Sequence, residues 1–424
     1  MRRIWLAAAL WAGSCSSPLK ETTSVDPAEL PALPVLMEAT SPVRGPQRAP
    51  VDVRIALVGE VRGELEPCGC PTVPYGGFGR RGRLLERLRG EGPLFHLDAG
   101  ELAMKGFATD RARDLKRRAH TTLELSKLVG VDLWVPGPSD LLALGSERIR
   151  KEPGPKRISA TWVDRRGQLM FPPVAVLEKS GIRLGVIGLS AAPIDSDEPG
   201  VTTRDPIEAA KAAVLLLPDD TDLNIALGNV SDDAAVAIAR QVPGLAAVLT
   251  VRGGEYDKPS TSRVNTQGGT PIIEVPDRGR YIQLLTVRVG TDAGTPVELK
   301  PEARAWRERG QQDTESAEFA EMGRGRNLGF ATTIPLGSDL DGKGPVEHSL
   351  RSFKQVSLAE AARRAAQAPP RAEPYYASSG SCVRCHSSEF ARWSLSAHAK
   401  AWPALLERND NENPECLPCH TTGW

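Results

Sequence analysis

The sequence predicts an α/β domain followed by a small, mainly helical C-terminal module. Strand-like runs alternate with helix-like runs over residues 51–300, and two C-x-x-C-H motifs lie at 382–386 and 416–420. The 53 basic and 53 acidic residues cancel, which argues against a large surface for nucleic acid. We therefore expect no nucleic-acid partner.

The first predicted element is the strand VRIALVGE at residues 53–60, an apolar run typical of a buried strand. The arginine-rich stretch 80–90 follows as a helix, and PLFHLDAGE at 93–101 as the next strand. The alternation continues with helices at 114–130, 205–217 and 232–241 and strands at 131–137, 182–190, 221–229, 245–253 and twice within 270–290. This order predicts an α/β domain whose functional loops lie at the C-terminal ends of its strands.

The N-terminus, MRRIWLAAALWAGSC, has the layout of an export signal. Two arginines precede an apolar run at 4–12, which at about nine residues is too short to cross a bilayer of roughly 30 Å. One interpretation is an ordinary secretion signal. We favour a bacterial lipoprotein signal over residues 1–15, in which Cys15 is lipidated, because AGSC resembles a lipobox with Ala12 in place of the more usual leucine.

Three further regions complete the predicted organisation. Residues 16–50 carry seven prolines and no apolar periodicity, so they are expected to form an extended linker. Residues 301–374 are predicted as helices and a linker, with His348 solvated in a loop, and residues 375–424 as the C-terminal module. The mature protein is expected to be exported and attached to a membrane through its lipid, as a periplasmic or outer-membrane-associated lipoprotein of a bacterium.

Four of the seven cysteines lie in the motifs CVRCH and CLPCH. C-x-x-C-H is the attachment signature of c-type haem, in which each thiol bonds to a haem vinyl group and the histidine is an axial iron ligand. A zinc ribbon is the alternative for two cysteine pairs, but the histidine after each pair and the export signal favour two haems. The predicted attachment residues are Cys382, Cys385 and His386 for one haem and Cys416, Cys419 and His420 for the other.

The stretch between the motifs places Phe390 and Trp393 at helical spacing, with His398 beside the same apolar stripe. A histidine on such a stripe is usually a core residue, but each haem iron has a second axial position to fill. His398 is therefore the candidate distal ligand. Twelve helical residues would separate it from His386 by about 18 Å, so the haem of His386 is not its expected partner. Pro403 is expected to break or restart the helix.

The segment CVRCHSSEFARWSLSAHAKAWPALLER…PECLPCHTTGW resembles the multihaem cytochrome c family related to nitrite reductase and hydroxylamine oxidoreductase. The resemblance covers roughly residues 375–424 and implies electron transfer through closely packed haems. It also implies that the histidine between the motifs, here His398, is an axial ligand. Because the chain ends four residues after His420, where such proteins usually continue, a redox partner protein or a further cytochrome subunit is expected to complete the shell of the second haem.

The larger domain carries GELEPCGC…GGFGRR, LDAGE, VPGPSDLLALG, GVIGLS and VPGLAAVL…GTPIIEV…GRY in that order. Over about residues 51–295 this order resembles the calcineurin-like metallophosphoesterase domain of the 5′-nucleotidase and sugar-nucleotide hydrolase family, including its sulfur-oxidation relative. The resemblance implies a four-layer α/β/β/α sandwich with a dinuclear metal site on the loops at the strand ends.

The metal-ligand positions implied by the resemblance are occupied by other residues. Asp-x-His reads Glu60-Val61-Arg62, Gly-Asp reads Gly100-Glu101, and Gly-Asn-His reads Gly137-Pro138-Ser139 before Asp140. A histidine position falls at Gly228-Asn229, and the final Gly-His-x-His region, VRGGEY, has no histidine. Because two metals need about six Asp, His and Asn ligands, we expect phosphoesterase catalysis to be lost. A weak mononuclear site of Glu60, Glu101 and Asp140 is the alternative, and His96 and His120 are expected in a strand core and mid-helix.

Cys68 and Cys70 lie in the glycine-rich loop that enters the arginine-rich helix, at a strand end where such a domain places its site. Three roles stay open: a redox pair, metal ligands, or small buried side chains. A disulfide across two residues is strained and therefore easily reduced. Arg80, Arg81 and Arg83 would lower a thiol pKa if they folded over the loop.

The leading functional interpretation is an exported, lipid-anchored cytochrome with two haems c. In it, the degenerate phosphoesterase-like domain is a binding or redox scaffold acting through Cys68 and Cys70. The alternatives are a redox enzyme for a small sulfur, nitrogen or nucleotide-like substrate, a residual metal-dependent phosphohydrolase, and a pure interaction scaffold.

Overall fold

The computed structural model describes part of the chain, and every structural statement below concerns that part. The described residues are 36–37, 52–67, 74–103, 112–193, 200–251, 264–265, 269–275, 277–289, 296–299, 327–367, 378–407, 411 and 417–421. Cys15, Cys68, Cys70 and Cys416 lie outside these ranges, and so does the side chain of Cys419.

Sheet A is a seven-stranded sheet with a parallel centre. Its parallel pairs β8–β10, β10–β11 and β11–β13 are flanked by β7, antiparallel to β8, and β12, antiparallel to β13. Along the sheet the strands are β1 (Leu36–Met37), β7 (Val174–Lys179), β8 (Ile182–Leu189), β10 (Leu223–Gly228), β11 (Ala247–Val251), β13 (Ile272–Val275) and β12 (Val264–Asn265).

Sheet B also has seven strands, and β2, β3, β4 and β5 are parallel while β14 runs antiparallel to β2. Its order is β15 (Val297–Leu299), β16 (Asn327–Pro335), β14 (Tyr281–Arg288), β2 (Asp52–Val58), β3 (Leu94–Asp98), β4 (Leu133–Trp134) and β5 (Lys156–Arg157). A two-stranded ribbon of β6 (Trp162–Asp164) and β9 (Val201–Thr203) stands apart from both sheets.

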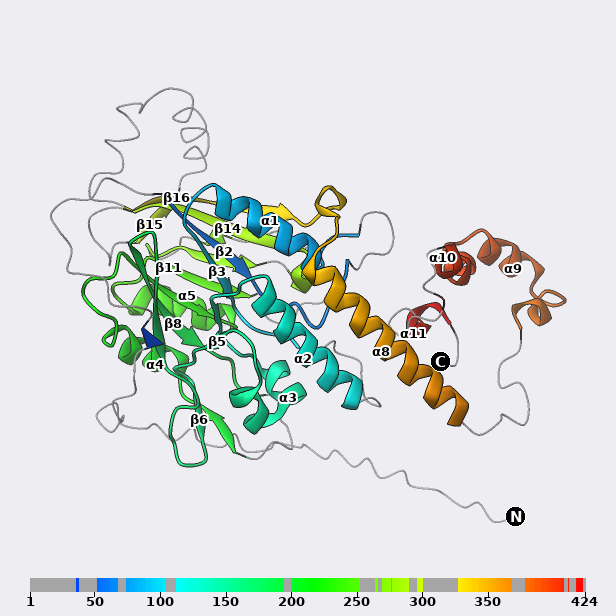
Figure 1. Cartoon of the computed structure of the whole chain (residues 1–424), viewed down its shortest axis with the longest axis horizontal. Coiled ribbons are helices and arrows are strands. Elements are labelled where there is room, and N and C mark those ends of the chain that lie inside the picture. The colour runs from blue at the N-terminus through cyan, green and yellow to red at the C-terminus, as the bar shows by residue number, and fades with distance from the viewer. Residues whose placement is uncertain are drawn as a thin grey trace, which may run out of the picture.

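Helices cover the outer face of each sheet (Figure 1). The helices α4 (Pro206–Val214) and α5 (Asp232–Gln241) pack on sheet A in one apolar cluster. On sheet B the helices are α1 (Phe78–Gly90), α2 (Ala112–Leu128), α3 (Pro138–Lys151) and α8 (Pro345–Gln367). A third cluster fills the space between the sheets. The predicted four-layer α/β/β/α sandwich is confirmed.

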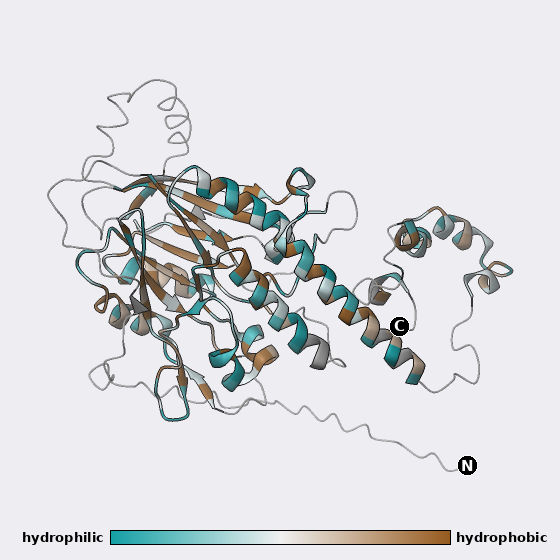
Figure 2. Cartoon of the chain, viewed as in Figure 1, coloured by the Kyte–Doolittle hydropathy of each residue, from teal (hydrophilic) through white to brown (hydrophobic). Residues whose placement is uncertain are grey.

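The strands are apolar on both faces because both faces are covered. In β2, Val53, Ile55 and Leu57 enter the cluster between the sheets, whereas Ala56 and Val58 enter the cluster under the helices. In Figure 2 the strands are mostly hydrophobic, whereas the helices that cover them carry both hydrophobic and hydrophilic residues. This double burial explains why an unbroken apolar run such as that at 53–60 predicted its strand correctly.

Two regions that were predicted to be helix or linker contain strands instead. Asn327–Pro335, in the part predicted as helices and linker, forms β16, which pairs with β14 along eight residues from Leu328 to Pro335. Its Thr-rich and β-branched composition suits a strand that is only half covered. Leu36–Met37, within the predicted linker, forms β1 and pairs with β7 at the edge of sheet A.

The C-terminal segment consists of short helices, as predicted. They are η4 (Ser379–Cys382), α9 (Ser387–Ser394), η5 (His398–Lys400), α10 (Ala401–Glu407) and α11 (Leu417–His420), and in Figure 1 they lie apart from the sheets, beyond α8. Pro403 falls in the first turn of α10, where the missing N–H breaks no helical bond, so the helix restarts there. No helix among the described residues is long and apolar enough to cross a membrane.

Candidate functional site

The loops that follow β2 and β3 run side by side beyond the strand ends. The backbone N–H of Glu60 donates to Gly100 O at 2.7 Å, and that of Arg62 donates to Glu101 O at 2.9 Å. Glu60, Arg62 and Glu101 have φ angles of 47°, 50° and 59°, in the left-handed region that non-glycine residues rarely adopt. These loops therefore hold an energetically unfavourable backbone conformation at the strand-end edge of the sheet. The sequence comparison placed the metal-ligand positions at this same edge.

Glu60 forms an ion pair with Arg62, the residue that replaces the histidine of the Asp-x-His motif. Arg62 Nη2 lies 3.2 Å from Glu60 Oε1, and the two side chains are 13% and 4% exposed. An ion pair this well covered is hard to separate, because either partner would be left as an uncompensated buried charge. Glu60 is thus committed to a protein cation rather than open to a metal ion.

Asp140 is bound by backbone donors. Its Oδ2 accepts from Gly137 N at 2.9 Å and Glu101 N at 3.0 Å, and its Oδ1 accepts from Ala103 N at 2.7 Å. Burial, followed by the neighbouring carboxylate of Glu101, raises the pKa of Asp140 well above its usual value. Burial also raises the pKa of Glu101, whose Oε2 accepts from Ser139 N at 3.2 Å. The two carboxyl groups fasten the loop ends together.

Asn229 joins the ends of four strands across the two sheets. Its Nδ2 donates to Ala99 O at 2.9 Å and also lies 3.3 Å from Val135 O and 3.4 Å from Pro136 O. Its Oδ1 accepts from Ala191 N at 2.6 Å. Gly100, with φ of 100°, makes room for this contact, because a Cβ there would lie 2.3 Å from Asn229 Nδ2. The amide therefore lies between the strand ends of the two sheets.

These residues do not fit a dinuclear metal centre. Within the described ranges no group of three or more His, Cys, Asp or Glu side chains is placed to hold a metal ion. The three carboxylates are engaged in the contacts above, so the alternative site of Glu60, Glu101 and Asp140 is not formed either. His96 is buried in β3, as expected, with Nδ1 at 3.2 Å from Gly130 O, and burial lowers its pKa well below the usual value. His120 contacts Glu152 from α2.

Arg81 and Asp98 form a buried polar pair that the sequence did not predict. Burial raises the pKa of Asp98 to about 7, against the opposing effect of the Arg81 charge, and burial lowers the pKa of Arg81 to about 10. Arg81 stacks on the Phe78 ring, 4.4 Å from its centroid, while Asp98 Oδ2 has no hydrogen-bond partner. The position of Asp98 at the end of an apolar strand was the only sign of it in the sequence.

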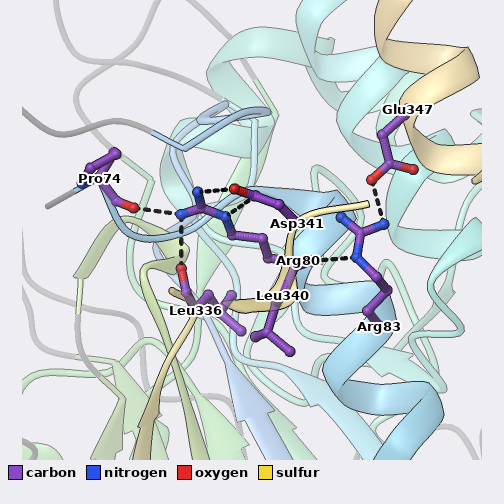
Figure 3. A network of polar contacts seen from close by, with 7 residues as sticks. All are labelled: Pro74, Arg80, Arg83, Leu336, Leu340, Asp341 and Glu347. Carbon is purple, nitrogen blue, oxygen red and sulfur yellow. Dashed lines mark hydrogen bonds and ion pairs between the residues drawn. The ribbon is translucent and has the colours of Figure 1, made fainter. Parts of the chain in front are cut away.

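Two further arginines of α1, Arg80 and Arg83, contact the chain just before α8 and its first turn (Figure 3). Arg80 pairs with Asp341 through Nε–Oδ1 at 2.6 Å and Nη2–Oδ2 at 3.1 Å, and it also donates to Pro74 O. Arg83 donates to Leu340 O and lies 2.7 Å from Glu347 Oε1 in an ion pair that is not a well-aligned hydrogen bond. Whether these arginines act on Cys68 and Cys70 stays a prediction, since both cysteines lie outside the described residues.

The first C-x-x-C-H motif forms a tight turn with free thiols. Cys382 and Cys385 are unbonded and exposed. The carbonyl of Cys382 accepts from Cys385 N at 3.3 Å and from His386 N at 2.9 Å, so the three residues are held within one turn of the chain. This arrangement suits a turn that attaches to two vinyl groups and one iron.

The histidine of the second motif, His420, contacts the start of α10 in the middle of the segment. His420 Nδ1 lies 2.6 Å from Ala401 O, which leaves Nε2 as the nitrogen available to a metal. Ala401 begins α10 directly after η5, whose first residue is His398. His398 is thus close in the chain to the contact made by His420, whereas α9 separates it from His386.

The described part of the C-terminal segment has almost no apolar core. Only Leu405 and Leu417 are buried there, whereas the side chains of Trp393 and Trp402 are both 41% exposed. Phe390 and Trp393 lie side by side, with ring centroids 5.5 Å apart. Exposed tryptophans on the same segment as two free thiols fit a fold completed by a large apolar group, which is what a haem macrocycle provides.

The C-terminal segment matches a known family model. Residues 381–424 match the family model described as cytochrome c554 and c-prime. The match supports haem c as the cofactor of the segment. No curated protein matches the sequence significantly.

The larger domain is similar to solved structures at low sequence identity. The 5′-nucleotidase precursor from Thermus thermophilus aligns with TM-score 0.53 and 19% identity, over 73% of this chain and 59% of that one. The calcineurin-like phosphoesterase YfkN from Bacillus subtilis aligns with TM-score 0.53 and 14% identity, over 73% and 99%. This domain has the calcineurin-like phosphoesterase fold.

The same fold occurs in a sulfate thiohydrolase. The sulfate thiohydrolase SoxB from Thermus thermophilus aligns with TM-score 0.53 and 15% identity, over 76% of this chain and 62% of that one. The chain therefore spans less than two thirds of SoxB and of the 5′-nucleotidase precursor. The predicted resemblance is confirmed at the level of fold. In this domain, Asn229 joins the loops at the strand ends.

Proposed function

We propose that this chain is an exported electron-transfer protein that carries two haems c. In this proposal the phosphoesterase-like domain is a binding or redox scaffold, not a phosphohydrolase. One observation carries the proposal: the free thiols of Cys382 and Cys385 and the imidazole of His420 lie on a segment whose exposed tryptophans lack a protein core. The match of residues 381–424 to a cytochrome model supports it.

The residues that would hold the haems are those of the two motifs. Cys382, Cys385 and His386 take the first haem, and Cys416, Cys419 and His420 take the second. His398 is the distal ligand of the second haem in this proposal, because it begins η5 just before Ala401, the residue that His420 contacts. Two bound haems would each supply an acceptor for one electron.

Cys68 and Cys70 are proposed as the electron-delivering pair. When their two S–H bonds break and an S–S bond forms, two electrons and two protons leave the thiols; the electrons match the two one-electron acceptors and the protons go to solvent. A dithiol redox partner protein restores the thiols by exchange with the disulfide. Export, lipid attachment at Cys15, and a periplasmic or outer-membrane location complete the proposal, and a further cytochrome subunit is the electron acceptor.

Haem content and ligation are the first test. The haem-loaded chain is expected to contain two covalent haems per polypeptide by the pyridine haemochrome assay. A His398→Met change is expected to keep both haems but to shift the low-spin electron paramagnetic resonance signal of one, because methionine is a different axial ligand. A chain without covalent haem would end the proposal, and unchanged signals would remove His398 as a ligand.

The role of Cys68 and Cys70 is tested by the kinetics of haem reduction. With dithiothreitol as the dithiol donor, the variant Cys68→Ser/Cys70→Ser is expected to reduce its haems about tenfold more slowly than the wild type, because the exchange step is missing. Ascorbate, which does not act through disulfide exchange, is expected to reduce both proteins equally fast. Equal rates with dithiothreitol as well would contradict the redox role of the pair.

A further inference from the structure

The short helix α11, which carries His420, is held against α10 at two points. One is polar: a carbonyl oxygen only accepts, so the imidazole of His420 donates through Nδ1, which lies 2.6 Å from Ala401 O. The other is apolar: Leu405 on α10 and Leu417 on α11 are 3% and 5% exposed, and the two helices are in contact. No other side chain is buried in the described part of the C-terminal segment.

The spacing of these residues places both points in one interface. Ala401 and Leu405 are four residues apart on α10, so they lie on one face of that helix. Leu417 and His420 are three residues apart on α11 and likewise share a face. Thr421 closes the end of α11, because its N–H and its hydroxyl both donate to Leu417 O, at 2.9 Å and 2.7 Å. The buried leucines therefore lie beside the contact that orients the imidazole.

The apolar point is the stronger of the two. Burying a leucine removes a whole side chain from water, whereas a partly covered hydrogen bond only replaces one made to water. A helix as short as α11 is also not stable by itself, so its position depends on what it packs against. The placement of the His420 ring next to Ala401 O thus depends on the packing of Leu405 against α11.

The histidine of the first motif has no comparable support. The imidazole of His386 is exposed and makes no hydrogen bond to any described residue. The backbone turn from Cys382 to His386 is formed, but its ring is not oriented by the described part of the chain. The two motifs therefore differ, because of the two rings only that of His420 is fixed by contacts between described residues.

We infer that Leu405 is a positioning residue for the axial ligand His420, acting through the packing of α11 on α10. The inference rests on the proposed binding of haem and adds which contact keeps Nδ1 on the Ala401 carbonyl and leaves Nε2 for the iron. A hydrogen bond at Nδ1 makes the other ring nitrogen a more basic ligand, which favours the oxidised iron. Loss of that bond raises the reduction potential of the iron that His420 binds.

The first test is a redox titration of the haem-loaded full chain, followed by absorption and electron paramagnetic resonance. Leu405→Ala is expected to raise one of the two midpoint potentials by about a tenfold change in the reduction equilibrium, which is about 59 mV for one electron, and to leave the other unchanged. Leu405→Ile, which keeps the side-chain volume, is expected to restore the wild-type value.

Leu406→Ala is the matched control for this test. Leu406 is the next residue on α10, but it is 50% exposed and does not lie between the two helices. Its removal deletes the same atoms as Leu405→Ala and is expected to leave both potentials at their wild-type values.

The second test does not need haem. In the haem-free full chain, nuclear magnetic resonance of isotope-labelled histidines shows which ring nitrogen carries the proton, and His420→Gln identifies the signal of His420. In the wild type and in Leu406→Ala the proton is expected on Nδ1. In Leu405→Ala the ring is expected to show the mixture of tautomers of an unrestrained imidazole.

Unchanged potentials in Leu405→Ala, or an equal shift in Leu406→Ala, would overturn the inference, and so would a wild-type His420 whose proton is not on Nδ1. If the wild type carries no covalent haem but Leu405→Ala still releases the Nδ1 proton preference, the proposed function fails and the positioning role stands. Two haems whose potentials ignore Leu405 would leave the proposed function intact and remove Leu405 as a positioning residue.

Discussion

Replacing Asn229 by alanine is expected to lower the free energy of unfolding by about 3 kcal/mol or more, because the change leaves several buried backbone groups without partners. Ala99 O and Ala191 N both lose their bonds to the amide, and Val135 O loses a longer one. The lost groups belong to loops of both sheets, so the two sheets should also separate more readily. Denaturant unfolding followed by circular dichroism measures the effect.

Asn224 provides the matched control, since it lies on β10, the strand that ends one residue before Asn229. Its side chain accepts one hydrogen bond, from Thr221 Oγ1 at 2.8 Å, and it is only half-buried. Asn224→Ala is therefore expected to cost about 1 kcal/mol. Equal losses in the two variants would show that Asn229 does not hold the strand-end loops together.

Replacing Asp98 by asparagine is expected to make the protein more stable than the wild type at pH 8 and about equally stable at pH 4. Burial raises the pKa of Asp98 from 3.8 to about 7, so the folded state favours the protonated carboxyl. The stabilising contribution of that proton is complete below 3.8 and is lost as the pH rises through about 7. The difference between these two values corresponds to about 4 kcal/mol, and asparagine does not titrate.

Denaturant unfolding of the two proteins between pH 4 and pH 8 gives the measurement, and Glu147→Gln gives a control of opposite sign. The hydrogen bond and charge of Lys151 lower the pKa of Glu147, so its contribution is present above the ordinary value of 4.5 and is lost at lower pH. That variant is expected to be less stable than the wild type above pH 4.5 and to approach the wild type as the pH falls below this value. If Asp98→Asn follows the wild type across the whole range, the buried proton is not on Asp98.

The sequence predicted most of the strands that are covered on both faces, although it missed β7 (Val174–Lys179), and it missed the half-covered β16. The apolar run at 182–190 corresponds to β8, Ile182–Leu189, because burial between layers demands apolar residues at every position. β16 was not predicted, since its polar threonines lie on a half-covered strand and its partner β14 is about 40 residues away in the chain. Pairing over that distance leaves no local periodicity to detect.

The candidate site shows a different limit. The sequence revealed that histidine ligands are missing and that Asn229 stands near one of their positions, but a missing ligand does not say what replaces it. The amide of Asn229 binds carbonyls 130, 94 and 93 residues away in the chain, and Arg80 reaches Asp341 across 261 residues. Such contacts depend on the assembled sheets. The C-x-x-C-H motifs were readable because a covalent attachment site is local in sequence.

The pairing of β1 with β7 limits the length of the chain that would connect the folded domain to a membrane. If Cys15 carries the proposed lipid, the chain between the anchor and β1 is residues 16–35, and these 20 residues reach at most about 70 Å when fully extended. Without β1, this connecting chain would extend to residue 51 and could reach about 120 Å. If the proposed lipid anchor is present, these two paired residues would confine the protein to a layer close to the bilayer, and the proposed electron acceptor would have to meet it within that height.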